Sequence, residues 1–188
     1  LILLQKMTET PLEEAKKYIN PEKEVNTAED ALNGAKDIFA ESVSDNADFR
    51  THIRELTMKH GQLLSAAKDP EAESVYEMYY EFSESLSKLA GHRILAISRG
   101  EKEKFLTVKI DAPVDRILSY LDRKLITAPS APTAAVLHEV TEDAYNRLIA
   151  PAIEREIRSD LFEKAEDGAI RVFGKNLEQL LMQPPIAG

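Results

Sequence analysis

The sequence predicts an all-α fold, a multi-helix scaffold with at most one or two short strands. Apolar residues recur three or four positions apart through most of the 188 residues, which is the spacing of one helix face. Several of these stretches begin at residues that cap helices and end near glycine or proline. Only one short run alternates in the manner of a strand.

Composition narrows the possible functions before any motif is considered. The chain has 33 acidic and 24 basic residues, a net charge of −9, which argues against holding nucleic acid by bulk electrostatics but leaves room for a local basic patch. The absence of cysteine excludes disulfides, thiolate metal sites and thiol nucleophiles, and agrees with a cytoplasmic location. No apolar run approaches the roughly 20 residues that span a bilayer, so no membrane partner is expected.

Both ends of the chain are interpreted as cut from a longer protein. The apolar quartet at residues 1–4 is expected to be the end of a helix, since such residues are normally covered. The breaker cluster at residues 184–188 is expected to connect to a missing domain. Between these ends, residues 1–126 are predicted to form a helical region with a short strand near residues 105–110.

The first helices carry recognisable start and stop signals. Asn20 and Pro21 break the first helical stretch, and Thr27 is predicted to cap a helix that runs to about residue 44. A full capping box requires Glu or Gln three residues after the cap, so Asp30 makes an imperfect one. Asn46 is predicted to cap the next helix, and Gly61 to end it in a left-handed conformation.

The clearest apolar stripe follows Asp69 and Pro70, and it predicts a further helix. Its members lie alternately four and three residues apart: Val75, Tyr79, Phe82, Leu86 and Leu89. They are expected to be buried, with replacement of Phe82 by Ala costing about 3 to 5 kcal/mol in a packed core. Base stacking by Tyr79, Tyr80 and Phe82 is the alternative, which the helical spacing disfavours.

One run, residues 105–110, is a strand candidate, and one strand cannot form a sheet. Its partner is expected at residues 62–67, at residues 92–98, or in a domain outside the chain. Between residues 92–98 and residues 105–110, Arg99 and Gly100 are expected to begin a charged turn, with Gly100 supplying a positive φ.

The second half of the chain is predicted to be helical almost throughout. A helix restarts at Pro113 and continues to about Leu125, and residues 127–133, with two prolines, form a loop or linker. Residues 134–183 are predicted to form long kinked helices. Pro151 should mark a kink or a helix start, with Ala150 less helical, because proline removes a backbone donor and restricts its predecessor.

No arrangement of residues indicates catalysis, a metal or a cofactor. The seven glycines are isolated, so no phosphate-binding loop is present, and His52 and His60 lie eight residues apart on one predicted helix. Carboxylates in the second half, such as Glu139, Asp143 and Glu154, stand among arginines at helical spacing. That pattern is typical of a solvated face with ion pairs. The chain is therefore not expected to be an enzyme.

The segment 91–110 holds five basic and two acidic residues, a local charge of +3 in an acidic chain. Candidate nucleic-acid contacts are Arg93, Arg99, Lys102 and Lys104. The structural alternative, in which Arg93 and Arg99 clamp carbonyls or carboxylates inside the fold, is favoured.

Four segments spread over the chain are similar to one family. They are residues 29–41 (EDALNGAKDIFAE), 92–101 (HRILAISRGE), 143–151 (DAYNRLIAP) and 176–185 (NLEQLLMQPP). In this order they closely resemble the central helical region of the bacterial transcription accessory protein Tex; Gly91 stands where that family has Ser. The resemblance implies an RNase-H-like domain, helix-hairpin-helix elements and an RNA-binding OB-fold outside this chain. It implies no catalytic residue within it.

The favoured function is therefore a helical scaffold fragment of a nucleic-acid-binding transcription accessory protein. It would position RNA-binding domains that lie outside the chain, and RNA or DNA would be bound by the full-length protein, with the transcription machinery as a further candidate partner. The alternative is a direct nucleic-acid-binding module that uses the segment 91–110. An enzyme ranks third.

Overall fold

The computed structural model describes residues 2, 5 and 9–182. The chain forms two compact units, unit 1 (Leu1–Leu56 and Pro113–Ile153) and unit 2 (Thr57–Ala112 and Glu154–Gly188). The helix end expected at residues 1–4 falls mostly outside the described residues, and the connection expected at residues 184–188 falls entirely outside them.

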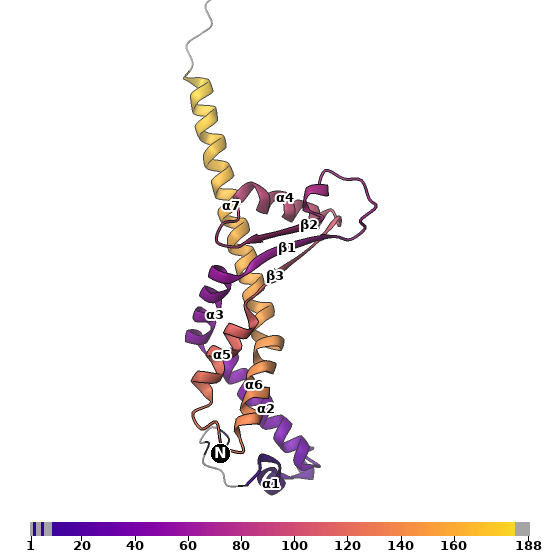
Figure 1. The fold of residues 1–188 in the computed structure, drawn as a ribbon, viewed down its shortest axis with the longest axis vertical. Helices are drawn as coiled ribbons and strands as arrows, with labels where there is room; N and C mark the ends of the chain where they lie inside the picture. Colours follow the sequence, from indigo (N-terminus) through magenta and orange to yellow (C-terminus); the bar gives the residue numbers. More distant parts are fainter. Residues whose placement is uncertain (1, 3–4, 6–8, 183–188) are drawn as a thin grey trace, which may run out of the picture. The chain divides into compact units, whose positions relative to one another are not determined.

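Unit 1 is helical (Figure 1). Its elements are α1 (Pro11–Ala15), η2 (Lys16–Tyr18), η3 (Pro21–Lys23), α2 (Ala28–Ser44), most of α3 (Ala47–His60), α5 (Val114–Leu125), α6 (Ala134–Asp143), the π-helix η5 (Ala144–Ile149) and the start of α7 (Ala150–Leu181). Helix α2 packs against α1, α6 and η5, and α5 packs against α6. The centre of this unit holds fully buried Ile117, Leu121, Leu137 and Ile149.

The predicted caps of α2 and α3 are confirmed. The Thr27 hydroxyl accepts from the Asp30 amide at 3.0 Å, and an Asp30 carboxylate oxygen accepts from the Thr27 amide at 2.9 Å. The capping box is thus complete, and the expectation that aspartate would make it imperfect is wrong, because the shorter side chain still reaches the cap. At α3, Asn46 Oδ1 accepts from the Phe49 amide at 3.0 Å.

Unit 2 is built on a three-stranded antiparallel sheet in the order β2-β1-β3. The strands are β1 (Gln62–Ala67), β2 (Glu81–Ser85) and β3 (Leu106–Asp111). Leu64 of β1 stands opposite Ser83 of β2 and Lys109 of β3. The fold is mostly helical as predicted, but the limit of one or two strands is wrong, because β1 has a partner on each side.

The helix predicted through residues 75–89 is wrong. This stretch contains a loop, the short helix η4 (Glu77–Tyr79), strand β2 and a turn. Tyr79 and Leu86 are buried as expected, whereas Val75 is 85% exposed. Residues 82, 84 and 86 also fit strand alternation, and serines at 83, 85 and 87 favour helices poorly, so pairing with β1 decides the structure.

Residues 92–98 form a helix and not a strand. They belong to α4 (Gly91–Lys102), which contains Arg99 and Gly100 and packs against β3, so the turn expected at Gly100 is wrong. No described glycine has a positive φ, which also corrects the left-handed end expected at Gly61. Between α4 and β3 the residue with a left-handed conformation is Lys104, with φ 68°. The run 105–110 pairs instead with residues 62–67, one of the predicted alternatives.

Pro151 lies at the junction of two helical forms. The π-helix η5 ends at Ile149 and α7 begins at Ala150, one residue before the proline. Ala150 has φ −58° and ψ −47°, so the expectation of a less helical Ala150 is wrong. The Ala150 amide bonds to the Tyr145 carbonyl, one residue further back than in an α-helix. A helical path with this wider turn accommodates the proline without an extended residue before it.

Candidate nucleic-acid interface

Helix α4 determines where most of the predicted nucleic-acid contacts lie. Ile97 and Gly100 are buried, and this fixes the face of α4 that the sheet covers. Arg93 and Lys102 are nine residues apart, which places them about 180° from each other around the helix. The cations of α4 therefore leave the helix on different sides and do not form one row.

Arg93 is held within unit 2. Its Nη1 donates to Glu84 Oε2 of β2 at 2.7 Å, and its guanidinium carbon lies 5.9 Å from the centre of the Phe82 ring. This is a clamp of the kind that the structural alternative predicts for an arginine on this segment. Contact between Arg93 and nucleic acid stays a prediction.

Arg99, Lys102 and Lys104 are exposed. The Lys102 Nζ lies 4.8 Å from the centre of the Phe162 ring of α7, a cation–π contact that leaves the ammonium accessible to solvent. Acidic groups lie among these cations. Burial, together with the hydrogen bond to Glu103, raises the pKa of the Tyr76 phenol, while the nearby charge of Arg99 lowers it. The electrostatic field around these three cations is consequently mixed in sign.

Lys109, the fifth cation of the segment, belongs to a different surface. It alternates on β3 with the buried residues Leu106 and Val108 and lies on the exposed face of the sheet, beside Leu64. The five cations that the sequence places within 20 residues are thus spread over both faces of the sheet and opposite sides of α4.

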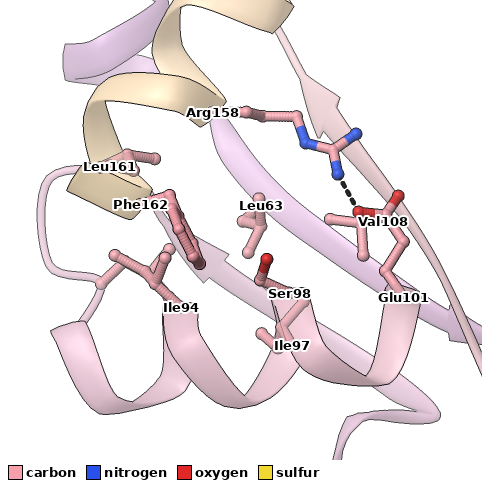
Figure 2. A pocket seen from close by; sticks show the side chains of 10 residues that line it. Leu63, Ile94, Ile97, Ser98, Glu101, Val108, Arg158, Leu161 and Phe162 are labelled. Carbon is pink, nitrogen blue, oxygen red and sulfur yellow. Dashed lines mark hydrogen bonds and ion pairs between the residues drawn. The ribbon is translucent and has the colours of Figure 1, made fainter. Parts of the chain in front are cut away.

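A small cavity of about 50 Å³ lies where α4, β1, β3 and α7 meet. Figure 2 shows Ile94, Ile97 and Phe162 around it, and Arg158 of α7 ion-paired with Glu101 of α4. The space is sufficient for one or two water molecules and too small for a nucleotide. Its apolar lining and single ion pair attach α7 to α4 and the sheet, which is a structural role.

The aromatic residues considered for base stacking are used in packing. Tyr79 is 6% exposed, as the core interpretation predicts, and its ring stands edge-on to Phe82 with centroids 5.4 Å apart. The Tyr80 hydroxyl donates to the Ala72 carbonyl at 2.5 Å and lies 2.9 Å from the Ser74 hydroxyl. Both tyrosines therefore order the loop between β1 and β2.

Carboxylates of unit 1 form ion pairs on its surface. Arg147 donates to Asp143 at 2.7 Å and to Asp37 at 3.1 Å, and Lys36 donates to Glu139 at 2.6 Å. The hydrogen bond from Arg147 lowers the pKa of the Asp143 carboxyl, which is opposite to what a general acid needs. The ion pair expected at helical spacing is confirmed for Asp143 and Arg147, whereas Glu139 pairs with Lys36 of α2.

Among residues 2, 5 and 9–182, no three metal-binding side chains gather into a group. His52, one of the two histidines considered as metal ligands, stacks its ring on Tyr120 with centroids 4.0 Å apart. No helix within the same residues is both long and apolar enough to cross a bilayer.

The C-terminal part of helix α7 presents an exposed apolar surface. Every residue from 166 to 182 is exposed. The apolar stripe of α7 consists of Ile170, Phe173, Leu177, Leu180 and Leu181, which are 44–76% exposed. In Figure 1 this end of α7, coloured yellow, continues beyond α4 with no other element of unit 2 beside it. The helical spacing of these apolar residues can be read from the sequence, but the spacing does not show whether anything covers the stripe.

Comparison with known proteins decides the family. The Tex central region-like family model matches residues 6–173. The chain belongs to the Tex central region-like family. The Bacillus subtilis protein YdcI is 50% identical over 177 residues, covering 93% of this chain, and Protein tex of Bordetella pertussis is 35% identical over 187 residues, covering 91%. The human S1 RNA-binding domain-containing protein 1 is 32% identical over 187 residues, covering 91%.

The Tex central region-like chain is short beside these relatives. It spans 25% of YdcI, 24% of Protein tex and 19% of the human protein. Most of the length of each relative therefore lies outside the region that matches.

Proposed function

We propose that this chain is a helical scaffold within a nucleic-acid-binding transcription accessory protein, and that it positions RNA-binding parts outside its own 188 residues. The observation that carries the proposal is the apolar stripe of α7, with its five large side chains in water. Fully burying one such side chain contributes roughly 1.5–3 kcal/mol, so a surface that covers the stripe gains enough to hold a domain in place.

The distribution of charge supports the same proposal. The chain carries a net charge of −9, and the cations of the segment 91–110 do not share a face. Of the relatives, the human protein is named for an S1 RNA-binding domain, and this chain spans 19% of it. RNA or DNA would then be held by other parts of the cytoplasmic full-length protein, with the transcription machinery as a further partner. No catalytic step and no cofactor is assigned to this chain.

Limited trypsin digestion tests the scaffold. In the 188-residue chain, the bonds after Arg171 and Lys175 should be cleaved early, because residues 166–182 are exposed. In the full-length protein the same bonds should be cleaved at least tenfold more slowly, because a docked domain covers the stripe. Mass spectrometry of the fragments measures both rates.

Substitutions identify the surface that provides the protection. Leu177→Glu in the full-length protein should restore fast cleavage after Arg171 and Lys175. Val172→Glu is the matched control, since Val172 is 61% exposed on the same helix but lies off the stripe. Equal cleavage of these bonds in the fragment and the full-length protein would contradict the scaffold proposal.

A direct nucleic-acid-binding module is the second candidate, and it is favoured by the exposure of Arg99, Lys102 and Lys104. Reversing these three charges in the full-length protein distinguishes the two candidates. A module predicts a large loss of RNA affinity from the triple change and little from Lys109→Glu on the other surface. The scaffold predicts that both variants bind RNA within about twofold of the unmodified protein.

A further inference from the structure

Unit 1 contains an open apolar groove of about 650 Å³ between α2 and the segment of α1 and η2. Its walls include Ala15 and Tyr18 on one side and Leu32, Ala35, Ile38 and Phe39 of α2 on the other. Ile38 is 71% exposed and Tyr18 57% exposed, so the apolar lining reaches the surface of the unit. The groove is separate from the cavity in unit 2 and from the apolar stripe of α7.

The shape of the groove suits an α-helix. Its α2 wall runs from Asp30 to Ser42, a length of about 18 Å at 1.5 Å per residue, or slightly more than three helical turns. Small residues line part of this wall, and a Cβ atom built on Gly34 would have no atom within 4 Å. A second helix can therefore approach the backbone of α2 closely while its apolar side chains enter between Ile38 and Tyr18.

The charge around the groove specifies the chemistry of that helix. Residues 9–45 contain ten acidic and four basic residues, a net −6 of the chain's −9. Two of the lysines are already paired, Lys17 with Glu14 at 2.5 Å and Lys36 with Glu139 at 2.6 Å. Glu14 and Asp30 belong to the lining itself. An acidic occupant would be repelled, whereas basic residues flanking an apolar stripe would be attracted.

We propose that this groove binds a basic amphipathic α-helix of a partner protein. Apolar residues of the helix, at positions i, i+3 or i+4, and i+7, lie along α2 between Leu32 and Ile38. Lysines or arginines beside this stripe face the carboxylates of α1 and α2. The interaction is independent of the α7 stripe and of nucleic acid, and it gives unit 1 a recognition role in addition to the proposed scaffold.

Two labelled 18-residue peptides test the groove by fluorescence anisotropy. One has leucines at i, i+3, i+4 and i+7 and lysines on the remaining positions, and the other has glutamates in place of the lysines. The lysine peptide should bind the 188-residue chain at least tenfold more tightly than the glutamate peptide. Equal affinity for the two peptides, or tighter binding of the glutamate peptide, would overturn the proposal.

Variants assign the binding to the groove. Ile38→Glu and Gly34→Trp should each lower the affinity for the lysine peptide at least tenfold. Gly34→Ala should bind this peptide with an affinity within twofold of that of the unmodified chain. Met78→Glu is the matched control for surface charge, because Met78 is 73% exposed in unit 2. Circular dichroism melts should show every variant folded. Equal binding by Ile38→Glu and Met78→Glu would refute the site.

The full-length protein provides the last arm of the test. It should bind the lysine peptide with an affinity within about threefold of the 188-residue chain. Failure to bind would mean that the groove is filled by the protein's own polypeptide, and it would overturn the assignment to a partner.

Discussion

Gly100 fixes how closely α4 approaches β3. A Cβ atom at this position would lie 2.7 Å from Leu106 Cδ1 and 3.0 Å from Tyr76 Cγ, and both of these neighbours are buried. The sequence indicated a special role for this glycine but attributed it to a positive φ. Glycine is instead required because there is no space for a side chain. The space is occupied by Leu106 and Tyr76, which lie 6 and 24 positions away in the sequence, so a rule based on neighbouring residues could not predict it.

Gly100→Ala should destabilise the protein by about 1–3 kcal/mol, the usual cost of overpacking a well-packed interior. Gly34→Ala is the matched control, because the same change in α2 meets no atom within 4 Å and should stabilise by up to about 1 kcal/mol through helix propensity. Urea unfolding of both variants measures the two free energies. Equal effects at positions 34 and 100 would contradict the close approach of α4.

Gln5 illustrates what the sequence could not predict at the scale of a residue. Its side-chain amide donates to the Leu125 carbonyl at 2.6 Å and accepts from the Thr127 and Ala128 amides at 2.8 Å each. These contacts satisfy backbone groups at the end of α5. They join positions about 120 residues apart, and sequence spacing carries no information about such a pair.

At the scale of elements, local signals predicted the helix starts well. Thr27 and Asn46 were found because a cap bonds only to residues two or three positions away. Strand β2 was missed because it exists through its pairing with β1, while the apolar spacing of residues 75–89 fits a helix equally well.

The cap of α2 predicts a stability change that can be measured directly. Thr27→Ala should cost about 1 kcal/mol, because the Asp30 amide loses its acceptor at the helix end. Thermal or urea unfolding measures the difference against the unmodified chain. A variant with unchanged stability would show that the capping box contributes nothing to α2.

Asp30 makes the same cap dependent on pH. Two hydrogen bonds lower the pKa of the Asp30 carboxyl below its ordinary 3.8. The larger effect comes from the bond with the Thr27 hydroxyl, and the smaller from the bond with the Thr27 amide. The contribution to stability is therefore present above that value and is lost as the pH falls through the lower, folded-state pKa. Asp30→Asn should be less stable than the unmodified chain at pH 7, and the difference should shrink below about pH 4. A difference independent of pH would exclude a role for the charge.

The revised position of Phe82 changes the expected cost of removing it. On β2 it is only half-buried, so Phe82→Ala should cost roughly 1–3 kcal/mol, less than the 3–5 kcal/mol of a fully buried ring. Leu106→Ala on β3, where the side chain has no exposed surface, should cost about 2–5 kcal/mol. Urea unfolding compares them, and a larger loss at position 82 would restore the core assignment.

At the scale of the whole molecule, the sequence could count charges but could not orient them. It identified the +3 segment at residues 91–110, and it was unable to show that Arg93 pairs with Glu84 or that Lys109 lies on the other face of the sheet. Orientation depends on which face of α4 the sheet covers, a tertiary property. For the same reason, the apolar spacing of residues 170–181 does not show whether that face of α7 is covered.

The spread of these cations predicts weak nucleic-acid binding with a shallow dependence on salt. Arg99, Lys102 and Lys104 are the exposed members of the predicted site that no described carboxylate pairs within 4 Å. Three phosphate contacts give a slope of about −2.7 in log affinity against log salt for duplex DNA, or roughly a 40-fold loss between 50 and 200 mM. Titrating labelled RNA and DNA against the 188-residue chain at both concentrations measures it. The opposite result would be tight binding at 200 mM salt that disappears when Arg93 and Arg99 are replaced. In that case both arginines would have to contact the same nucleic acid, and the direct binding module would be favoured over the scaffold.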